Sequence, residues 1–247
     1  MPIVTFTAAS EQTFKFYIPD NFASALGANE YFEYSVGDGE WTQFKTTVDN
    51  IKFGGSHGNL RLRGKSSKGT ALHSGADYST IKFTTANSPV DCTGDIRTLI
   101  DYENYADVST ADAKFCSLFY QNTELRTAPE LPAKTLAELC YCLMFSGCTA
   151  LTTAPALPAE TLAFGCYLEM FKGCSKLSSV TMLAFDVSAE MLDQWLIGAG
   201  TSVQESQKPT LYLNPGVYSR DVYNKKFDEW APKYQIYGDW DVKPYGE

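Results

Sequence analysis

The sequence predicts an α+β protein in which a β-sandwich is followed by a short solenoid of helix-and-strand repeats and a C-terminal cap. Residues 1–90 contain short runs that alternate apolar and polar residues, which is typical of strands. Residues 128–153 and 154–179 are near copies of each other, with 15 of their 26 aligned positions identical. A period of this length indicates stacked units that bury their apolar faces against each other. We therefore expect three parts, covering residues 1–90, 91–200 and 201–247.

The charge and hydropathy of the chain argue against some kinds of binding partner. The chain has 247 residues and a net charge of −9, from 20 basic and 29 acidic side chains. No basic stripe is present for a phosphate backbone or an anionic membrane surface, so we expect neither nucleic acid nor membrane binding. No stretch is apolar enough to cross a bilayer, and the first residues do not read as a signal peptide. Either Met1 is the true initiator or a leader was removed before this numbering.

The first 90 residues predict a sandwich of seven strands. The turn sequence Gly37-Asp38-Gly39 joins two of them as a hairpin. The surrounding sequence YSVGDGEW resembles a hairpin of immunoglobulin-like modules found on bacterial surface and carbohydrate-active proteins, which implies an immunoglobulin-like domain. The expected strands are residues 4–7, 13–18, 31–36, 41–44, 50–53, 60–63 and 80–84.

Each clean repeat predicts one helix and one short strand. Thr135 and Thr161 are candidate helix N-caps, and Gly147 and Gly173 stand where a glycine would end each helix. Residues 151–153 then read as a strand, and the paired prolines after it suit an extended return. Residues 115–125, which precede the clean repeats, are a degenerate copy of part of the same unit. Five residues share one predicted helical face: Leu136, Leu139, Cys140, Leu143 and Met144.

The sequence after the second repeat predicts a closing cap. Residues 182–186 begin a third turn of the solenoid, and residues 189–196 read as a helix. Residues 210–218 begin with a last strand and lead through a turn into a helix that contains Tyr223 and Phe227. These elements would cover the open apolar end of the solenoid.

One helix and one strand per 26 residues is leucine-rich-repeat geometry. The unit APxLPAxTLAxxCYxxMFxGCxxL resembles the BspA-like leucine-rich repeats of bacterial surface proteins. The C-terminal LYLNPGVYSRDVYNKKFDEW is similar to the segment that caps many of them. The resemblance covers about residues 95–235 and implies an extracellular adhesion or ligand-binding role. Modules of this family also occur in phage virion proteins, which leaves a virion role open.

The seven cysteines read as buried thiols of the solenoid interior, where a free cysteine behaves as a small apolar residue. A disulfide or zinc set is the alternative. The spacing of Cys140, Cys142 and Cys148 lacks the paired pattern of common zinc sites, and Leu168 replaces Cys142 in the second copy.

Few residues are candidates for catalysis, and no catalytic motif, cofactor or metal site is predicted. His57 and His73 lie in loop-like sequence and read as surface residues. Two acidic side chains could still meet in space as a glycosidase pair. The segment rich in carboxylates reads as a solvated face, with calcium binding as the alternative: Asp91, Asp95, Asp101, Glu103, Asp107 and Asp112. A C-terminal aromatic group reads as core, with a sugar-stacking surface as the alternative: Trp230, Tyr234, Tyr237, Trp240 and Tyr245.

These observations favour a non-enzymatic binding or adhesion protein that recognises a surface glycan or host protein, located on the bacterial cell surface. The alternative is a structural phage virion component, such as a head or tail fibre or a decoration protein, and this role would allow a homo-oligomer. The sequence does not single out ligand-binding residues.

Overall fold

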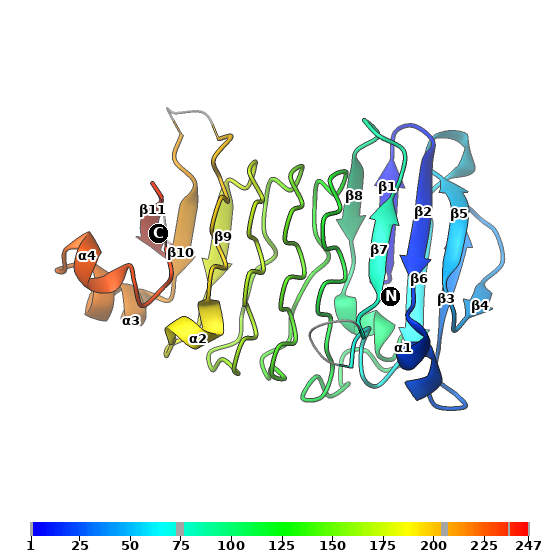
Figure 1. The fold of residues 1–247 in the computed structure, drawn as a ribbon, viewed down its shortest axis with the longest axis horizontal. Helices are drawn as coiled ribbons and strands as arrows, with labels where there is room; N and C mark the ends of the chain where they lie inside the picture. Colours follow the sequence, from blue (N-terminus) through cyan, green and yellow to red (C-terminus); the bar gives the residue numbers. More distant parts are fainter. Residues whose placement is uncertain (1, 73–76, 204–206, 237, 247) are drawn as a thin grey trace.

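The structure is a computed structural model that describes residues 2–72, 77–203, 207–236 and 238–246. Figure 1 shows an elongated molecule with the N-terminal sheets at one end, a stack of coils in the middle and a small parallel sheet toward the C-terminus. The described residues form eleven strands in three sheets. Their helices are short; the longest α-helix, α1 (Asp20–Ala25), has six residues.

The predicted α+β class is wrong, because the structure is mostly β. The helix predicted in each clean repeat is absent: in the described part of residues 101–188 no helix is formed. The strand predicted at 151–153 is reduced to isolated bridges at Thr153. Farther on, the helix predicted over 189–196 is only α2 (Ala189–Leu192), and the C-terminal helix is divided into α3 (Pro215–Val217), the π turn η3 (Tyr218–Val222) and α4 (Phe227–Trp230).

Two antiparallel sheets make up the N-terminal part; a strand forms at each of the seven predicted positions, and an eighth strand, β8, was not predicted and extends past residue 90. One sheet has the order β4-β3-β6-β1-β8 and the other the order β5-β2-β7. The two sheets pack against each other through phenylalanine rings. The ring centroids of Phe6 (β1) and Phe83 (β7) are 5.3 Å apart, as are those of Phe16 (β2) and Phe32 (β3). The strands are β1 (Val4–Ala8), β2 (Gln12–Tyr17), β3 (Tyr31–Val36), β4 (Thr42–Phe44), β5 (Val48–Phe53), β6 (Leu60–Lys65), β7 (Thr80–Phe83) and β8 (Val90–Thr93), with the 3₁₀ turns η1 (Gly55–His57) and η2 (Ile96–Leu99) between and after them.

In the clean repeats the backbone runs as successive turns that are hydrogen-bonded to the next coil. Leu139 and Leu143 have φ of 58° and 57°, in the left-handed region that a right-handed helix cannot contain. Alternate amides, including those of Tyr141 and Phe145, donate to carbonyl oxygens 25 residues farther along, at 3.1 and 3.0 Å. The apolar spacing that predicts a helical face therefore arises from a run of turns in which left-handed residues recur every four positions, at Leu139, Leu143 and Gly147.

The coils stack in register, so identical side chains lie on top of each other. The rings of Phe119, Phe145 and Phe171 are nearly parallel, with centroids 5.5 and 5.7 Å apart and interplanar angles of 3° and 2°. The three side chains are fully buried. Phenylalanine recurs every 26 residues because each ring packs on its copy in the core, as the repeated sequence predicts.

Backbone pairing continues through the coils to both ends of the molecule. Leu125 bridges Val90 of β8, Thr127 bridges Thr153, and Thr153 bridges Ser179 of β9 (Ser179–Met182), all in parallel orientation. β9 pairs with β10 (Thr210–Leu213), which pairs with β11 (Asp241–Pro244), again in parallel. A hydrogen-bonded ladder thus runs from β4 at one end of the chain's fold to β11 at the other.

Replacing Phe145 with Ala removes the central ring of the stack and should lower the free energy of unfolding by about 3–5 kcal/mol. Chemical denaturation measures the loss. Phe164→Ala is the matched control, because that ring is 54% exposed on the same coils, and it should cost no more than about 0.5 kcal/mol. Equal losses in the two variants would contradict the stacked core.

Candidate functional site

The outer face of the parallel sheet is polar because its strands alternate. Leu211 and Leu213 of β10 are fully buried, so Thr210 and Tyr212 lie on the opposite face. The register then sets two rows across that face. One row is Ser179, Thr210 and Asp241, and the other is Thr181, Tyr212 and Lys243.

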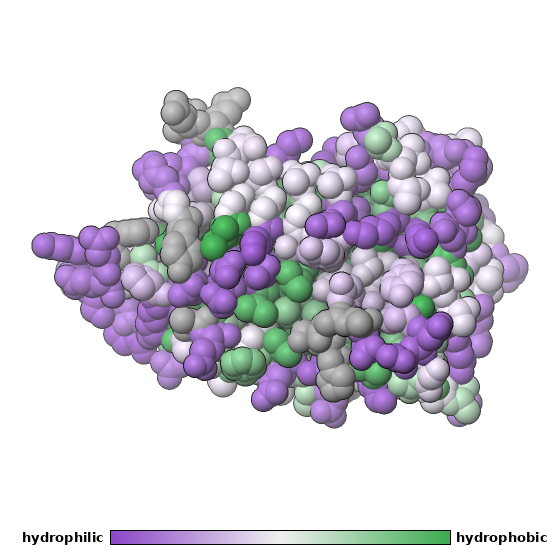
Figure 2. Space-filling model, viewed as in Figure 1, coloured by the Kyte–Doolittle hydropathy of each residue, from purple (hydrophilic) through white to green (hydrophobic). Residues whose placement is uncertain are grey.

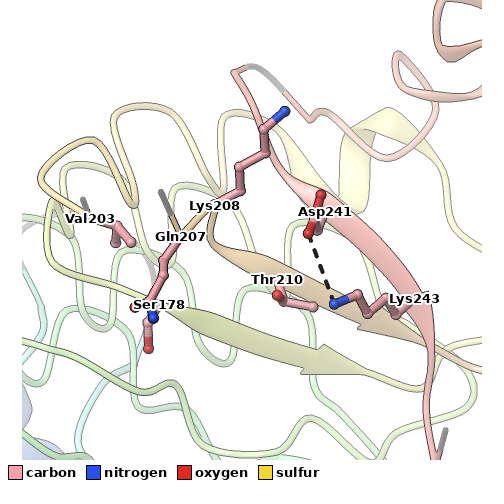
Figure 3. Close-up of a pocket in the computed structure, with 7 residues that line it drawn as sticks. All are labelled: Ser178, Val203, Gln207, Lys208, Thr210, Asp241 and Lys243. Atoms are coloured by element: carbon pink, nitrogen blue, oxygen red, sulfur yellow. Dashed lines mark ion pairs between the residues drawn. The ribbon is translucent and has the colours of Figure 1, made fainter. Parts of the chain in front are cut away.

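A polar pocket of about 550 Å³ lies at one end of these rows (Figure 3). Thr210 comes from β10, Asp241 and Lys243 come from β11, and Ser178 directly precedes β9. Loop residues ahead of β10 supply the remaining wall. The complete lining is Ser178, Val203, Gln207, Lys208, Thr210, Asp241 and Lys243.

The pocket offers hydrogen-bond donors and acceptors of several kinds side by side. The Lys243 Nζ and an Asp241 carboxylate oxygen are 3.9 Å apart, and about half of each side chain is exposed. Lys208 instead binds Asp239 through a contact of 2.7 Å, and this hydrogen bond raises the pKa of the Lys208 ammonium group. Hydroxyl, amide, carboxylate and ammonium groups together suit a ligand rich in hydroxyl groups.

Asp221 holds the segment that leads into β11. Its carboxylate accepts two hydrogen bonds from Arg220, at 3.0 and 2.7 Å, and one from the Tyr234 hydroxyl at 2.8 Å. Lys233 adds a contact of 3.3 Å. Trp195, from the last coil, donates its indole N–H to the Tyr234 carbonyl oxygen at 2.8 Å. These contacts tie the chain ahead of β11 to the coil stack and so position one wall of the pocket.

A second pocket, of about 310 Å³, lies over the proline segments of the two clean repeats. Pro129 and Pro132 line it from one coil, and Pro155 and Pro158 line it from the next. Glu130 is the only charged residue in the lining. The surface is apolar and repeats with the coils, as expected where each segment returns in extended form.

The sequence did not reveal an alternating ladder of cations and aromatic rings on the outer face of the five-stranded sheet. Arg63 lies between Trp41 and Tyr102, with its guanidinium 3.9 and 4.0 Å from the two ring centroids. Arg61 contacts the Trp41 ring at 5.3 Å, and Lys65 contacts the Tyr102 ring at 5.2 Å. The alternation Arg61-x-Arg63-x-Lys65 was the available signal, since it places three cations on one face of a strand.

The side chains of this ladder pack against one another and leave little room for a ligand between them. Glu33 accepts a 2.6 Å hydrogen bond from Arg63, and less than a fifth of either side chain is exposed. A hydrogen bond with Tyr31, together with burial, raises the pKa of Tyr102 to about 12. Because cations already lie against the rings of Trp41 and Tyr102, these faces are not open platforms for a sugar ring.

The residues singled out from the sequence do not come together in one site. His57 is paired with Glu11 at 2.8 Å on the surface, and His73 lies outside the described residues. Among the described residues, no group of three metal-ligating side chains forms. All seven cysteines are buried and free, as the interpretation as buried thiols predicts.

The carboxylate-rich segment contains several ion pairs in place of one solvated face. Asp95 is buried and receives a bidentate interaction from Arg97. Asp91 pairs with Arg126, and a hydrogen bond from that arginine lowers the pKa of the carboxyl group. The remaining pairs link Lys65 with Asp101 and Glu103; Asp107 and Asp112 are exposed.

Most of the C-terminal aromatic group is core. Trp230, Tyr234 and Trp240 are buried, and Tyr245 is about half exposed. Tyr237 lies outside the described residues. The sugar-stacking alternative therefore has at most one exposed ring among the described members of this group.

No family model matches the chain, and no curated protein or solved structure is significantly similar to it. Among the described residues, no helix is long and apolar enough to cross a membrane.

Asp221→Asn should lower the free energy of unfolding by about 2–3 kcal/mol at neutral pH, because it removes the charge from several hydrogen bonds. The hydrogen bonds from Arg220 hold the pKa of the Asp221 carboxyl below its ordinary 3.8. Its stabilising effect is therefore complete above that pH and is lost as the pH falls below it.

The pH dependence of Tm, measured for both proteins from pH 7 downward, checks this. The difference between wild type and variant should be constant at neutral pH and should shrink below about pH 4. Asp49→Asn, in an exposed pair with Lys15, is the control and should change Tm little. A difference between wild type and Asp221→Asn that grows in acid would contradict the assigned role.

Proposed function

We propose that the protein is a non-enzymatic binding protein that recognises a surface glycan through the polar pocket of the parallel sheet. The observation that carries the proposal is the set of groups at this pocket, where Thr210, Asp241 and Lys243 lie within one pair of strands. Such a mixture of donors and acceptors matches the hydroxyl groups of a saccharide, and a fixed strand register holds it in place.

The cellular setting is part of the same proposal. The likeness of the repeat sequence to bacterial surface proteins, together with the polar pocket, supports exposure at a cell or virion surface. A structural virion component remains the alternative function.

Asp241→Asn combined with Lys243→Ala should weaken glycan binding about 10-fold or more, because two charged hydrogen-bonding groups are removed. A glycan array with the wild-type protein first identifies the ligands. Calorimetric titration of the strongest one then compares the variants. The matched control is Asp49→Asn combined with Lys15→Ala, which neutralises an exposed pair on β5 and β2 and should leave the affinity unchanged.

Two results would contradict the proposal. One is a folded protein that binds no glycan on the array, and the other is a pocket variant that binds as tightly as the wild type. Light scattering that shows a stable oligomer, combined with a blank array, would favour the virion component.

A further inference from the structure

Three pairs of cysteines stand at equivalent positions of neighbouring coils. They are Cys116 with Cys142, Cys140 with Cys166, and Cys148 with Cys174, each separated by the 26-residue repeat. The backbone amides of Phe115 and Ser117 donate to the backbone carbonyl oxygens of Cys140 and Cys142. These hydrogen bonds place Cys116 directly opposite Cys142. Backbones that are hydrogen-bonded side by side, as these coils are, lie about 4.8 Å apart. This separation is within the Cα range of roughly 4.4–6.8 Å that a disulfide spans.

The sulfur environments distinguish the three pairs. The Sγ atoms of Cys148 and Cys174 donate to the carbonyl oxygens of Phe119 and Phe145, at 3.0 and 3.1 Å, so each sulfur is directed toward the backbone of the preceding coil. Cys140 and Cys166 belong to the main hydrophobic core. Burial raises the pKa values of all four of these thiols, which keeps them protonated.

The pair of Cys116 and Cys142 lies outside that core. With Ala71 the two form a separate small cluster. The side chains packed over it are only partly buried: Tyr78, Leu139, Leu143 and Leu168. In Figure 2, hydrophobic residues also gather at the surface over the central coils. The pair is therefore covered by side chains that themselves reach the surface.

The two thiols already interact with each other. Their side chains pack in one cluster, and the interaction between them lowers the pKa of Cys116 and, together with burial, raises that of Cys142. Cys116 also lies 3.6 Å from the Ser117 hydroxyl oxygen. A thiolate formed at Cys116 has the second sulfur beside it, as thiol oxidation requires.

We propose that Cys116 and Cys142 are a redox-reactive modification site that forms one disulfide between the first two coils under oxidising conditions. The two thiols lose two protons and two electrons as the S–S bond forms, and a disulfide oxidant such as glutathione disulfide accepts them and leaves as two thiols. The bond closes a loop through one whole coil, which restricts the unfolded chain. The other five cysteines stay reduced.

The test is to treat the full wild-type chain with glutathione disulfide, block the remaining thiols with iodoacetamide in denaturant, and map the linkages by mass spectrometry. Trypsin releases Cys116 as the only cysteine of residues 115–126, and chymotrypsin cleaves after Tyr141 to separate Cys140 from Cys142. The expected result is a single linkage between Cys116 and Cys142, and a rise in Tm on the order of 5 °C.

Two variants complete the test. Cys142→Ser should abolish the linkage and the rise in Tm, and Cys166→Ser should leave both intact. The wild-type map decides the question even where a variant folds poorly. The proposal is overturned if the native protein forms no disulfide, if it links one of the other two pairs, or if it shows the same scrambled linkages as protein oxidised in denaturant.

Discussion

The hydrogen bonds that pass from each coil to the next are the constraint on which the rest of the structure depends. Without them, the coils of residues 128–179 would keep only the hydrogen bonds within each turn, such as the one from the Cys140 amide to the Ala137 carbonyl oxygen, and every second amide would lack a partner. With them, alternate amides such as those of Leu143 and Phe145 meet carbonyl oxygens in the following coil. This pairing fixes the 26-residue register, and the register places every repeated side chain on its copy, as in the rings of Phe119, Phe145 and Phe171.

The same register separates the interior of the molecule from its exposed faces. Repeated positions supply the buried rings and thiols, whereas the polar pocket is built mostly beyond the repeat, from β10, β11 and the loop before β10, with Ser178 at the end of the second repeat. Asp221 and Tyr234 then tie the chain ahead of β11 to the last coil through Trp195. The repeated residues therefore account for stability, and the proposed binding groups are residues that the repeats do not contain.

The strands of the first 90 residues were predictable because their alternation is local, and the repeated unit was predictable because identity at a fixed spacing is visible without a structure. The conformation predicted for that unit was wrong. The apolar residues from Leu136 to Met144 fit a helical face, yet Leu139 and Leu143 adopt left-handed conformations in which their amides donate to carbonyl oxygens of the next coil. The pocket was not predictable either, because Ser178, Thr210 and Asp241 meet through long-range strand pairing. Similarly, the Tyr102 ring lies against Arg63, but its segment showed only a cluster of carboxylates in the sequence.

Deletion of residues 128–153 tests the fixed register most directly. The deletion joins Thr127 to Ala154 and removes one complete coil, so Phe119 should stack on Phe171 and the pairing should continue in register. We expect a protein that unfolds in a single cooperative transition and keeps its near-ultraviolet circular dichroism, with lower stability than the full chain. Deletion of residues 128–147 removes an incomplete coil and should abolish both properties. If the two deletions behave alike, whether both fold or both fail, the coils are not interchangeable units held by a 26-residue register.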